Sequence, residues 1–370
     1  MIDPDLSPDE LLLAKTVRGW FDNFVDNTYL NAQEVSDLGY EPHRWKEINR
    51  LGWSSINIPE RLGGAGATLA EAAIIARELG RAAYASPLLS TVRTATVLAD
   101  APADPRSDAA LTELVAGAPA ALVAPPDRAV TATSSGSGGF RLAGRPVVVE
   151  WLEAATSVVL VVPVSADGHW LYALVSPREL SGRVTPVPSI DNERAAWLDL
   201  DGFDLPLDGV LAHVPGPQAD YAMARANLLR ASLMVGGCES VLERTARYAK
   251  EREQFGQPIG AFQAVRHHLA RMAIATDAAR LACNDALVRA TPDAQESAIV
   301  AVALFAAGRS YVQVVLTAAQ VHGGVGTTAE HVLHHHFRRA KAMQLRSGRR
   351  ADRLHEIHDA LIVRGEGSLW

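Results

Sequence analysis

The chain has 370 residues, of which 48% are hydrophobic, and a formal net charge of −7 at pH 7. This length and composition allow a large core divided among about two or three domains. The negative balance and the lack of a long basic run argue against nucleic acid as a partner.

The first residues do not read as a signal peptide, because an acidic Met-Ile-Asp-Pro-Asp start has no positive segment followed by an apolar one. No apolar stretch approaches the roughly 20 residues that a membrane-spanning helix needs. Cys238 and Cys283 each lie in an apolar helical pattern and are interpreted as buried thiols in a reducing compartment. We therefore expect a cytoplasmic protein without a membrane partner.

Residues 1–118 form the first predicted domain, which is helical. Apolar residues recur with helical spacing over 9–25 and over 69–79. Proline and glycine within 59–66 predict a loop between helices. Residues 101–118 are interrupted by proline and glycine, and we expect a poorly ordered connection there.

Residues 119–216 form the second predicted domain, a small antiparallel β domain. Residues 147–149, 157–164 and 170–175 are rich in β-branched and aromatic residues, and a Ser/Gly cluster at 134–139 is typical of a turn.

Residues 217–370 form the third predicted domain, a four-helix bundle. Apolar residues recur every three or four positions over 228–242 and 262–272, with a Gly/Pro-broken segment at 252–260 between them. The predicted fold class is therefore α+β, with helices, strands and helices in that order.

Four short stretches stand out in this order and spacing. Residues 51–66 contain Leu-Gly-Trp, Ile-Pro-Glu and Gly-Gly-Ala-Gly, and residues 78–81 read Glu-Leu-Gly-Arg. Residues 251–260 read Glu-Arg-Glu-Gln-Phe-Gly-Gln-Pro-Ile-Gly, and residues 320–326 read Gln-Val-His-Gly-Gly-Val-Gly. In these motifs the chain resembles the acyl-CoA dehydrogenase family over nearly its whole length.

The resemblance implies the fold of that family, FAD as cofactor, an acyl-CoA substrate and an electron-transfer acceptor. It also implies a tetramer in which the last two stretches grip the ADP half of the FAD held by a neighbouring subunit. The residues that carry over to this role are Arg252, Gln254, Phe255, Ile259, Gln263, Gln320, Gly323 and Gly324.

The chemistry of these residues agrees with that role. Arg252 lies where a helix gives way to a loop and could bind a diphosphate, and Phe255 offers a flat face to adenine or ribose. Gly323 and Gly324 would let backbone N–H groups approach a phosphate. Read in isolation, the same residues could be an exposed arginine, a core phenylalanine and a plain helix-to-helix turn.

Other parts of the family's active site are missing from this sequence. The Thr-Glu-Pro and Gly-Ser-Asp signature has no counterpart near residues 123–127, and Trp-Ile-Thr is replaced within 146–151. The Tyr-Glu-Gly-Thr motif, which supplies the catalytic glutamate, is replaced by Arg-Ser-Gly-Arg at 346–349. Ser347 cannot substitute for a carboxylate base without an activating partner.

Some members of the family place the glutamate on an earlier helix, where this chain has Ala226 and Asn227. Glu239 and Glu243 lie further along that helix, either as displaced bases or as packing residues. We therefore assign no catalytic residue.

His331 and His335 have the i,i+4 spacing of a metal pair, but no cysteine or neighbouring carboxylate completes a site in the sequence, so we expect no metal.

Three functions remain compatible with the sequence. The first is a subunit that completes the FAD site of a homologous catalytic chain in a heterotetramer, as in steroid catabolism. The second is a self-sufficient flavin dehydrogenase with a displaced base. The third is a protein of the same fold with a non-redox or binding role in a biosynthetic pathway.

Overall fold

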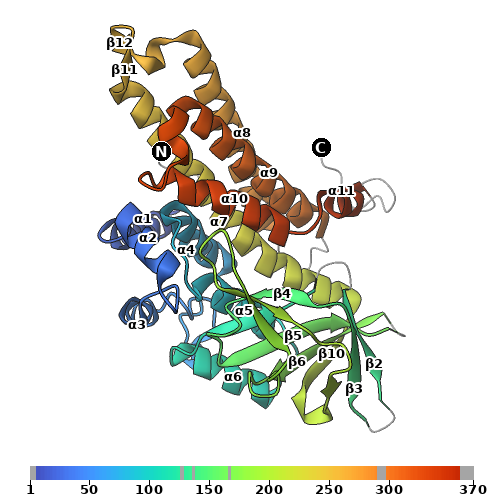
Figure 1. The fold of residues 1–370 in the computed structure, drawn as a ribbon. Coiled ribbons are helices and arrows are strands. Elements are labelled where there is room, and N and C mark those ends of the chain that lie inside the picture. Colours follow the sequence, from blue (N-terminus) through green and yellow to red (C-terminus); the bar gives the residue numbers. More distant parts are fainter. Residues whose placement is uncertain (1–5, 126–128, 136–137, 166–167, 290–296, 359–370) are drawn as a thin grey trace.

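The computed structural model describes residues 6–125, 129–135, 138–165, 168–289 and 297–358. Figure 1 shows a helical part and a β part packed side by side, with a long helical bundle extending away from both. This arrangement confirms the predicted fold class.

The N-terminal part is helical, and several of its helices begin with strong caps. Ser7 caps α1 and Thr68 caps α4, each in a capping box with a glutamate three residues later. The helices are α1 (Pro8–Asp22), α2 (Asn27–Val35), α3 (Pro42–Arg50), α4 (Leu69–Ala82), α5 (Leu88–Ala99) and α6 (Pro105–Val115), with the 3-10 helix η1 (Glu60–Leu62) before α4.

The expectation of a poorly ordered connection at 101–118 is wrong. Asp104 caps α6, and Pro105 occupies its first turn, where the missing N–H costs nothing. Ala110, Leu111 and Leu114 are buried in a cluster with residues of α5 and β1. The prolines that suggested a break are the start signal of a packed helix.

The described residues of the middle part form three small sheets. The strands are β1 (Ala120–Val123), β2 (Val130–Ser134), β3 (Phe140–Gly144), β4 (Val147–Glu150), β5 (Ser157–Pro163), β6 (His169–Val175), β7 (Val184–Val187), β8 (Ala195–Leu198), β9 (Asp204–Leu205) and β10 (Val210–Pro215), with the 3-10 helix η3 (Leu207–Gly209) before β10. The sheet orders are β1-β5-β6-β10, β2-β3-β9 and β4-β8-β7.

The sequence predicts a purely antiparallel β domain, but the structure also contains one parallel pair of strands. β1 runs parallel to β5, in the register Ala120 opposite Ser157. β1 follows α6 and lies at the edge of its sheet. The strands between β1 and β5 in the sequence, β2, β3 and β4, belong to the other two sheets. Parallel pairing of β1 with β5 therefore needs a long crossover, which short-range patterns do not reveal.

The C-terminal part is built around α7 (Gly216–Glu251), which is 36 residues long. At 1.5 Å per residue it spans roughly 54 Å, from the β part to the far end of the bundle. The other elements are β11 (Glu253–Gln254), β12 (Gln257–Pro258), η4 (Ile259–Ala261), α8 (Gln263–Arg289), α9 (Ser297–His322), η5 (Gly323–Thr327), α10 (Leu333–Arg346) and α11 (Arg350–His358).

Helix α9 corrects the expectation that no stretch is long and apolar enough to cross a membrane. Residues 298–327 pass that test by length and hydropathy. However, 61% of the tested window is buried inside the fold. Val314 and Ala318 of this helix belong to the main hydrophobic core, together with α7 and α8, so the apolar character of α9 is that of a central bundle helix.

Glycines allow a close crossing between α4 and α7. A Cβ atom at Gly80 would overlap the carbonyl oxygen of Leu233, and one at Gly236 would overlap that of Arg77. Two helix backbones can approach this closely only where side chains are absent. The crossing joins the N-terminal part to the bundle.

Candidate functional site

The far end of the bundle presents the residues predicted to face a neighbour's FAD. Figure 1 shows the β11–β12 hairpin at the tip of the molecule, away from the sheets. Seven of the eight predicted residues are exposed and Ile259 is half-buried. We call this set of eight, from Arg252 to Gly324, the outer surface.

A stacked pair of rings holds the two halves of the outer surface side by side. Tyr248, one turn before Arg252, stacks on His322 with ring centroids 4.2 Å apart. His322 directly precedes Gly323 and Gly324, around which a Cβ atom would meet nothing within 4 Å. The backbone of this glycine turn is therefore accessible to a large ligand.

Phe255 is not a core residue, which removes one of the alternative interpretations of its motif. Its side chain is 92% exposed. It lies in a two-residue turn with Gly256, and both have positive φ, 54° and 81°. This backbone conformation is costly for a bulky residue, and the cost is characteristic of positions selected for contact rather than for stability. The exposed ring and Arg252 together offer an apolar face and a cation to a ligand.

A second site, which we call the inner pocket, lies where the three parts of the chain meet. Its volume is about 320 Å³. Apolar walls come from residues on β1, β4, β8 and α10, among them Leu122, Val149, Trp197 and Leu345. Val123, Ala124 and Pro125, from the segment where the family's Thr-Glu-Pro and Gly-Ser-Asp signature is missing, also line the inner pocket. Residues 126–128 of that region lie outside the described part of the chain.

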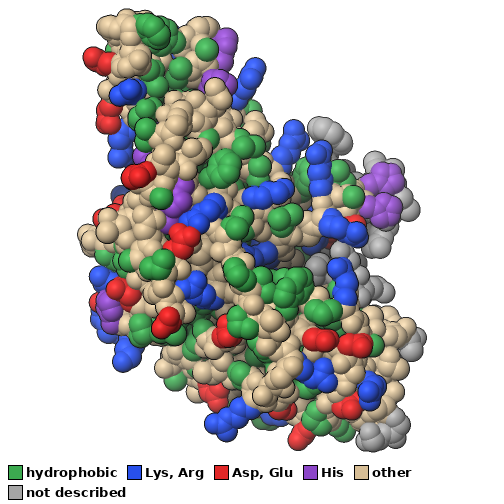
Figure 2. All heavy atoms as spheres, viewed as in Figure 1, with side chains coloured by type: hydrophobic (Ala, Val, Ile, Leu, Met, Phe, Trp, Pro, Cys, Tyr) green, Lys and Arg blue, Asp and Glu red, His purple; other side chains and the backbone are tan. Residues whose placement is uncertain are grey.

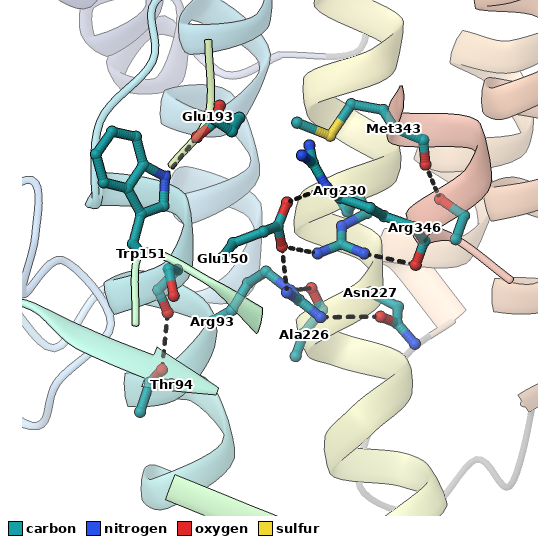
Figure 3. Close-up of polar contacts among 12 residues, drawn as sticks. Arg93, Thr94, Glu150, Trp151, Glu193, Ala226, Asn227, Arg230, Met343 and Arg346 are labelled. Carbon is teal, nitrogen blue, oxygen red and sulfur yellow. Dashed lines mark hydrogen bonds and ion pairs between the residues drawn. The ribbon is translucent and has the colours of Figure 1, made fainter. Parts of the chain in front are cut away.

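Four charged side chains from four different elements occupy the polar end of the inner pocket (Figure 3). They are Arg93 of α5, Glu150 of β4, Arg230 of α7 and Arg346 of α10, and we call them the ionic cluster. Glu150 pairs with Arg230, and lies 3.5 Å from Arg346 and 3.7 Å from Arg93. Burial acts to raise the pKa of Glu150, but the three arginines outweigh it and hold the pKa at about 2.

The sequence did not single out any member of the ionic cluster for its charge. Glu150 falls within residues 146–151, where the sequence indicated a replacement without fixing it to a residue. A glutamate that ends an otherwise apolar strand, Val-Val-Val-Glu, was the available signal. Its three arginine partners come from positions 57, 80 and 196 residues away, so no local pattern connects them.

The positions expected to carry a catalytic base do not provide one. Ser347 is buried and its hydroxyl donates to the carbonyl oxygen of Met343 at 2.8 Å. Ala226 and Asn227 accept hydrogen bonds from Arg93 instead. Arg93 Nε donates to the Ala226 carbonyl oxygen at 3.0 Å, and a terminal guanidinium nitrogen of Arg93 donates to Asn227 Oδ1 at 3.2 Å.

Glu239 and Glu243 are packing residues at the α4–α7 contact. Glu239 pairs with Arg77 and Arg81, and Glu243 pairs with Arg81. Neither lines the inner pocket. Both carboxylates are thus held by guanidinium groups away from the cavity.

A second cavity of about 270 Å³ lies on the other side of the end of α10. Ser347 and Arg349 line this cavity. Figure 2 shows Lys and Arg side chains gathered over α10 and α11. Arg349 forms an ion pair with Asp352 at 2.6 Å and its side chain is largely exposed, so it does not fill the inner pocket.

The histidines have a carboxylate neighbour that the sequence did not reveal. Glu34 of α2 lies close enough to His334 and His335 for the three side chains to share a metal ion. Arg338, however, already binds both carboxylate oxygens of Glu34, at 2.6 and 2.7 Å. A cation would have to displace this guanidinium group, so the arrangement fits an ion pair better than a metal.

Three comparisons with known proteins bear on this geometry. Residues 7–106 match the acyl-CoA dehydrogenase N-terminal domain, and residues 219–362 match the acyl-CoA dehydrogenase C-terminal domain. The acyl-CoA dehydrogenase IpdE2 of Mycobacterium tuberculosis is 33% identical over 332 residues, covering 89% of this chain and 90% of that protein.

Two solved structures superpose on nearly the entire chain. One is a variant of the Tcur3481-Tcur3483 steroid ACAD and the other is the ChsE4-ChsE5 complex from Mycobacterium tuberculosis. Each is 26% identical with a TM-score of 0.86, and each comparison covers 97% of this chain and 99% of the matched chain. The chain therefore belongs to the acyl-CoA dehydrogenase family of FAD-dependent oxidoreductases.

Proposed function

We propose that this chain is the non-catalytic subunit of a hetero-oligomeric acyl-CoA dehydrogenase. Its outer surface would complete the FAD site of a homologous catalytic chain, which removes two hydrogens from an acyl-CoA. FAD, when bound, supplies the hydride acceptor, and an electron-transfer acceptor reoxidises it. This chain would hold the ADP half and contribute no base.

The contrast between its two sites carries the proposal. The outer surface has the groups that an ADP moiety needs: a cation, an exposed aromatic ring and an open glycine turn. In the inner pocket, by contrast, a flavin ring would have to displace buried charges that already bind one another. The residues fit the ADP half of FAD and do not fit its ring.

The two solved relatives support the hetero-oligomer and the substrate class. One is a steroid ACAD whose name joins two components, and the other is a complex of two differently named chains. By similarity we propose a steroid-derived acyl-CoA as the substrate of the assembly, with two copies of each chain.

The self-sufficient alternative has little support from the geometry. It needs a carboxylate base facing a substrate, yet Glu239 and Glu243 are bound to arginines outside the pocket. Glu150 does face the pocket, but a carboxyl group with a pKa of about 2 is a weak proton acceptor. A non-redox role predicts a chain that binds no flavin in any assembly.

Native mass spectrometry with flavin quantitation tests the proposal. The chain is expressed alone and together with a homologue that keeps the family's catalytic glutamate. The expected complex contains one FAD per two chains. A homotetramer with one FAD per chain would refute the heteromeric function, and a flavin-free homomer that does not associate with the homologue would favour the non-redox alternative.

A further inference from the structure

The ionic cluster contains more positive than negative charge. Its three guanidinium groups are matched by two carboxylates, those of Glu150 and Asp191, the latter bound to Arg346 through both oxygens. Arg346 also donates to Ser189 Oγ at 2.7 Å, and Arg230 to the Arg346 carbonyl oxygen at 2.8 Å.

Arg93 is the cation left without a carboxylate of its own. Its hydrogen bonds go to neutral acceptors, the Ala226 carbonyl oxygen and Asn227 Oδ1, and Glu150 is 3.7 Å away. Burial and the positive charge of Arg230 together lower the pKa of Arg93 to about 9, against the opposing effect of Glu150. An uncompensated buried charge is costly, and a bound counter-ion would offset that cost.

The pocket gives a ligand access to this charge. The four side chains of the ionic cluster are between 7% and 14% exposed, so each is buried but still accessible from the cavity. The remaining walls are largely apolar, with Leu122, Val147 and Trp197 among them. A volume of about 320 Å³ is at the lower end of the range for small-molecule sites, roughly 300–1,000 Å³.

We propose that the inner pocket is a binding site for a small organic carboxylate with an apolar body, whose carboxylate group pairs with Arg93. A planar guanidinium group binds a carboxylate through two hydrogen bonds, and one negative charge balances the cluster. The apolar walls would enclose the rest of the ligand. Free phosphate carries more charge than the cluster lacks and has no apolar part to bury.

This site is separate from the FAD surface that the proposed function assigns to the chain. The β11–β12 hairpin of the outer surface lies at the tip of the bundle, away from the sheets (Figure 1). The inner pocket is lined by residues of α5, the β part, α7 and α10. Binding of a carboxylate can therefore be measured without a flavin readout, and the two proposals can fail independently.

Isothermal titration of the full chain with three probes at pH 7.5 tests the inference. Cyclohexanecarboxylate should bind, and cyclohexanecarboxamide, which has the same shape without the charge, should bind at least tenfold more weakly. Inorganic phosphate should not bind in the pocket. Equal binding of the acid and the amide, tighter binding of phosphate than of the acid, or no binding of the acid would each overturn the proposal.

A pair of variants locates the site. Arg93→Gln leaves Arg230 and Arg346 matched by Glu150 and the neighbouring Asp191, so the fold should be retained. Affinity for cyclohexanecarboxylate should fall at least tenfold. Arg309→Gln, a basic residue of the second cavity, should leave the affinity unchanged. Unaltered binding by Arg93→Gln would overturn the assignment to Arg93. If that variant does not fold, the comparison of acid with amide on the unmodified chain still decides.

Discussion

Individual residues show how the buried charges of the inner pocket are neutralised. Glu150 is a buried carboxylate whose stability depends on three guanidinium groups, and those groups depend on it in turn. Removing one partner of a buried ion pair is much more costly than never having had the pair, because the remaining charge is left without solvent.

Replacing Glu150 with Gln should therefore lower the free energy of unfolding by about 3–5 kcal/mol, measured by urea denaturation at pH 7. The pKa of Glu150 is lowered in the folded chain to about 2, so its contribution is fully present above pH 4.5 and is lost as the pH falls toward 2. The variant should lack this part of the acid sensitivity. Glu251→Gln, at the exposed end of α7, is the control, and an equal effect of both substitutions would contradict the account.

Arg252 tests the outer surface at the residue scale. In the hetero-oligomer, Arg252→Ala should remove a charge-assisted contact worth about 1.5–3 kcal/mol, which corresponds to roughly 10- to 150-fold weaker FAD retention. Flavin release during dialysis, followed by absorbance, measures the effect. Lys250→Ala, an exposed cation on the same helix end, should not change it. Unchanged retention in Arg252→Ala would argue against its role.

At the scale of elements, short connections and helix crossings determine how the two sites are positioned. The β11–β12 hairpin holds Phe255 at a positive φ, and the α4–α7 crossing fixes the bundle against the N-terminal helices. The positive φ of Phe255 lowers the stability of the fold, whereas the α4–α7 crossing raises it. Substitutions in these elements should therefore have opposite effects on stability.

Phe255→Gly should separate stability from function. Glycine adopts the left-handed turn without a Cβ penalty, so the free energy of unfolding should stay the same or rise by up to about 1 kcal/mol. FAD retention in the hetero-oligomer should nevertheless fall, because an exposed aromatic face is lost. Thermal unfolding and flavin quantitation on the same sample measure both quantities. A variant that retains FAD normally would show that Phe255 does not contact the cofactor.

Gly236→Ala should destabilise the chain by about 1–3 kcal/mol or more, because its methyl group would overlap the backbone of α4 at Arg77. A methyl group added at Gly19 in α1 would meet nothing within 4 Å, and Gly19→Ala should stabilise by up to about 1 kcal/mol. Chemical denaturation compares the two. If both alanines were tolerated equally, the α4–α7 contact would be looser than the structure has it.

At the scale of the whole molecule, the charges of the inner pocket join the three parts of the chain. Arg93 comes from the N-terminal helices, Glu150 from the β part, and Arg230 and Arg346 from the bundle. The place where the parts meet is therefore lined by buried charges that pair with one another.

The purified chain alone should consequently not oxidise an acyl-CoA with a dye acceptor, whereas the co-expressed complex should. Ser347→Glu should not create activity in the isolated chain, because the ionic cluster still occupies the polar end of the pocket. Turnover is followed by dye bleaching, with flavin content measured in parallel. Robust turnover by the homomer would contradict the subunit function and would make Glu243→Gln the next variant to examine.

The sequence by itself determined the family and the order of helical and β parts, and it predicted the residues of the outer surface. These depend on local patterns: the spacing of apolar residues, and contiguous motifs such as residues 251–260 and 320–326. It also indicated that Ser347 stands where a base is expected. It was misleading at residues 101–118, because proline at the first turn of a helix looks like a break when its packing partners are unknown.

Only the tertiary structure revealed the ionic cluster of the inner pocket. The partners of Glu150 are distant in the sequence, and Arg93, Arg230 and Arg346 each lie in an ordinary helix. The same holds for the pairing of Glu239 with Arg77, for Glu34 beside the histidines, and for the parallel contact of β1 with β5. Charge neutralisation and strand pairing depend on which elements lie next to one another in the folded chain. The packing of the whole chain determines these contacts, and a local sequence pattern does not reveal them.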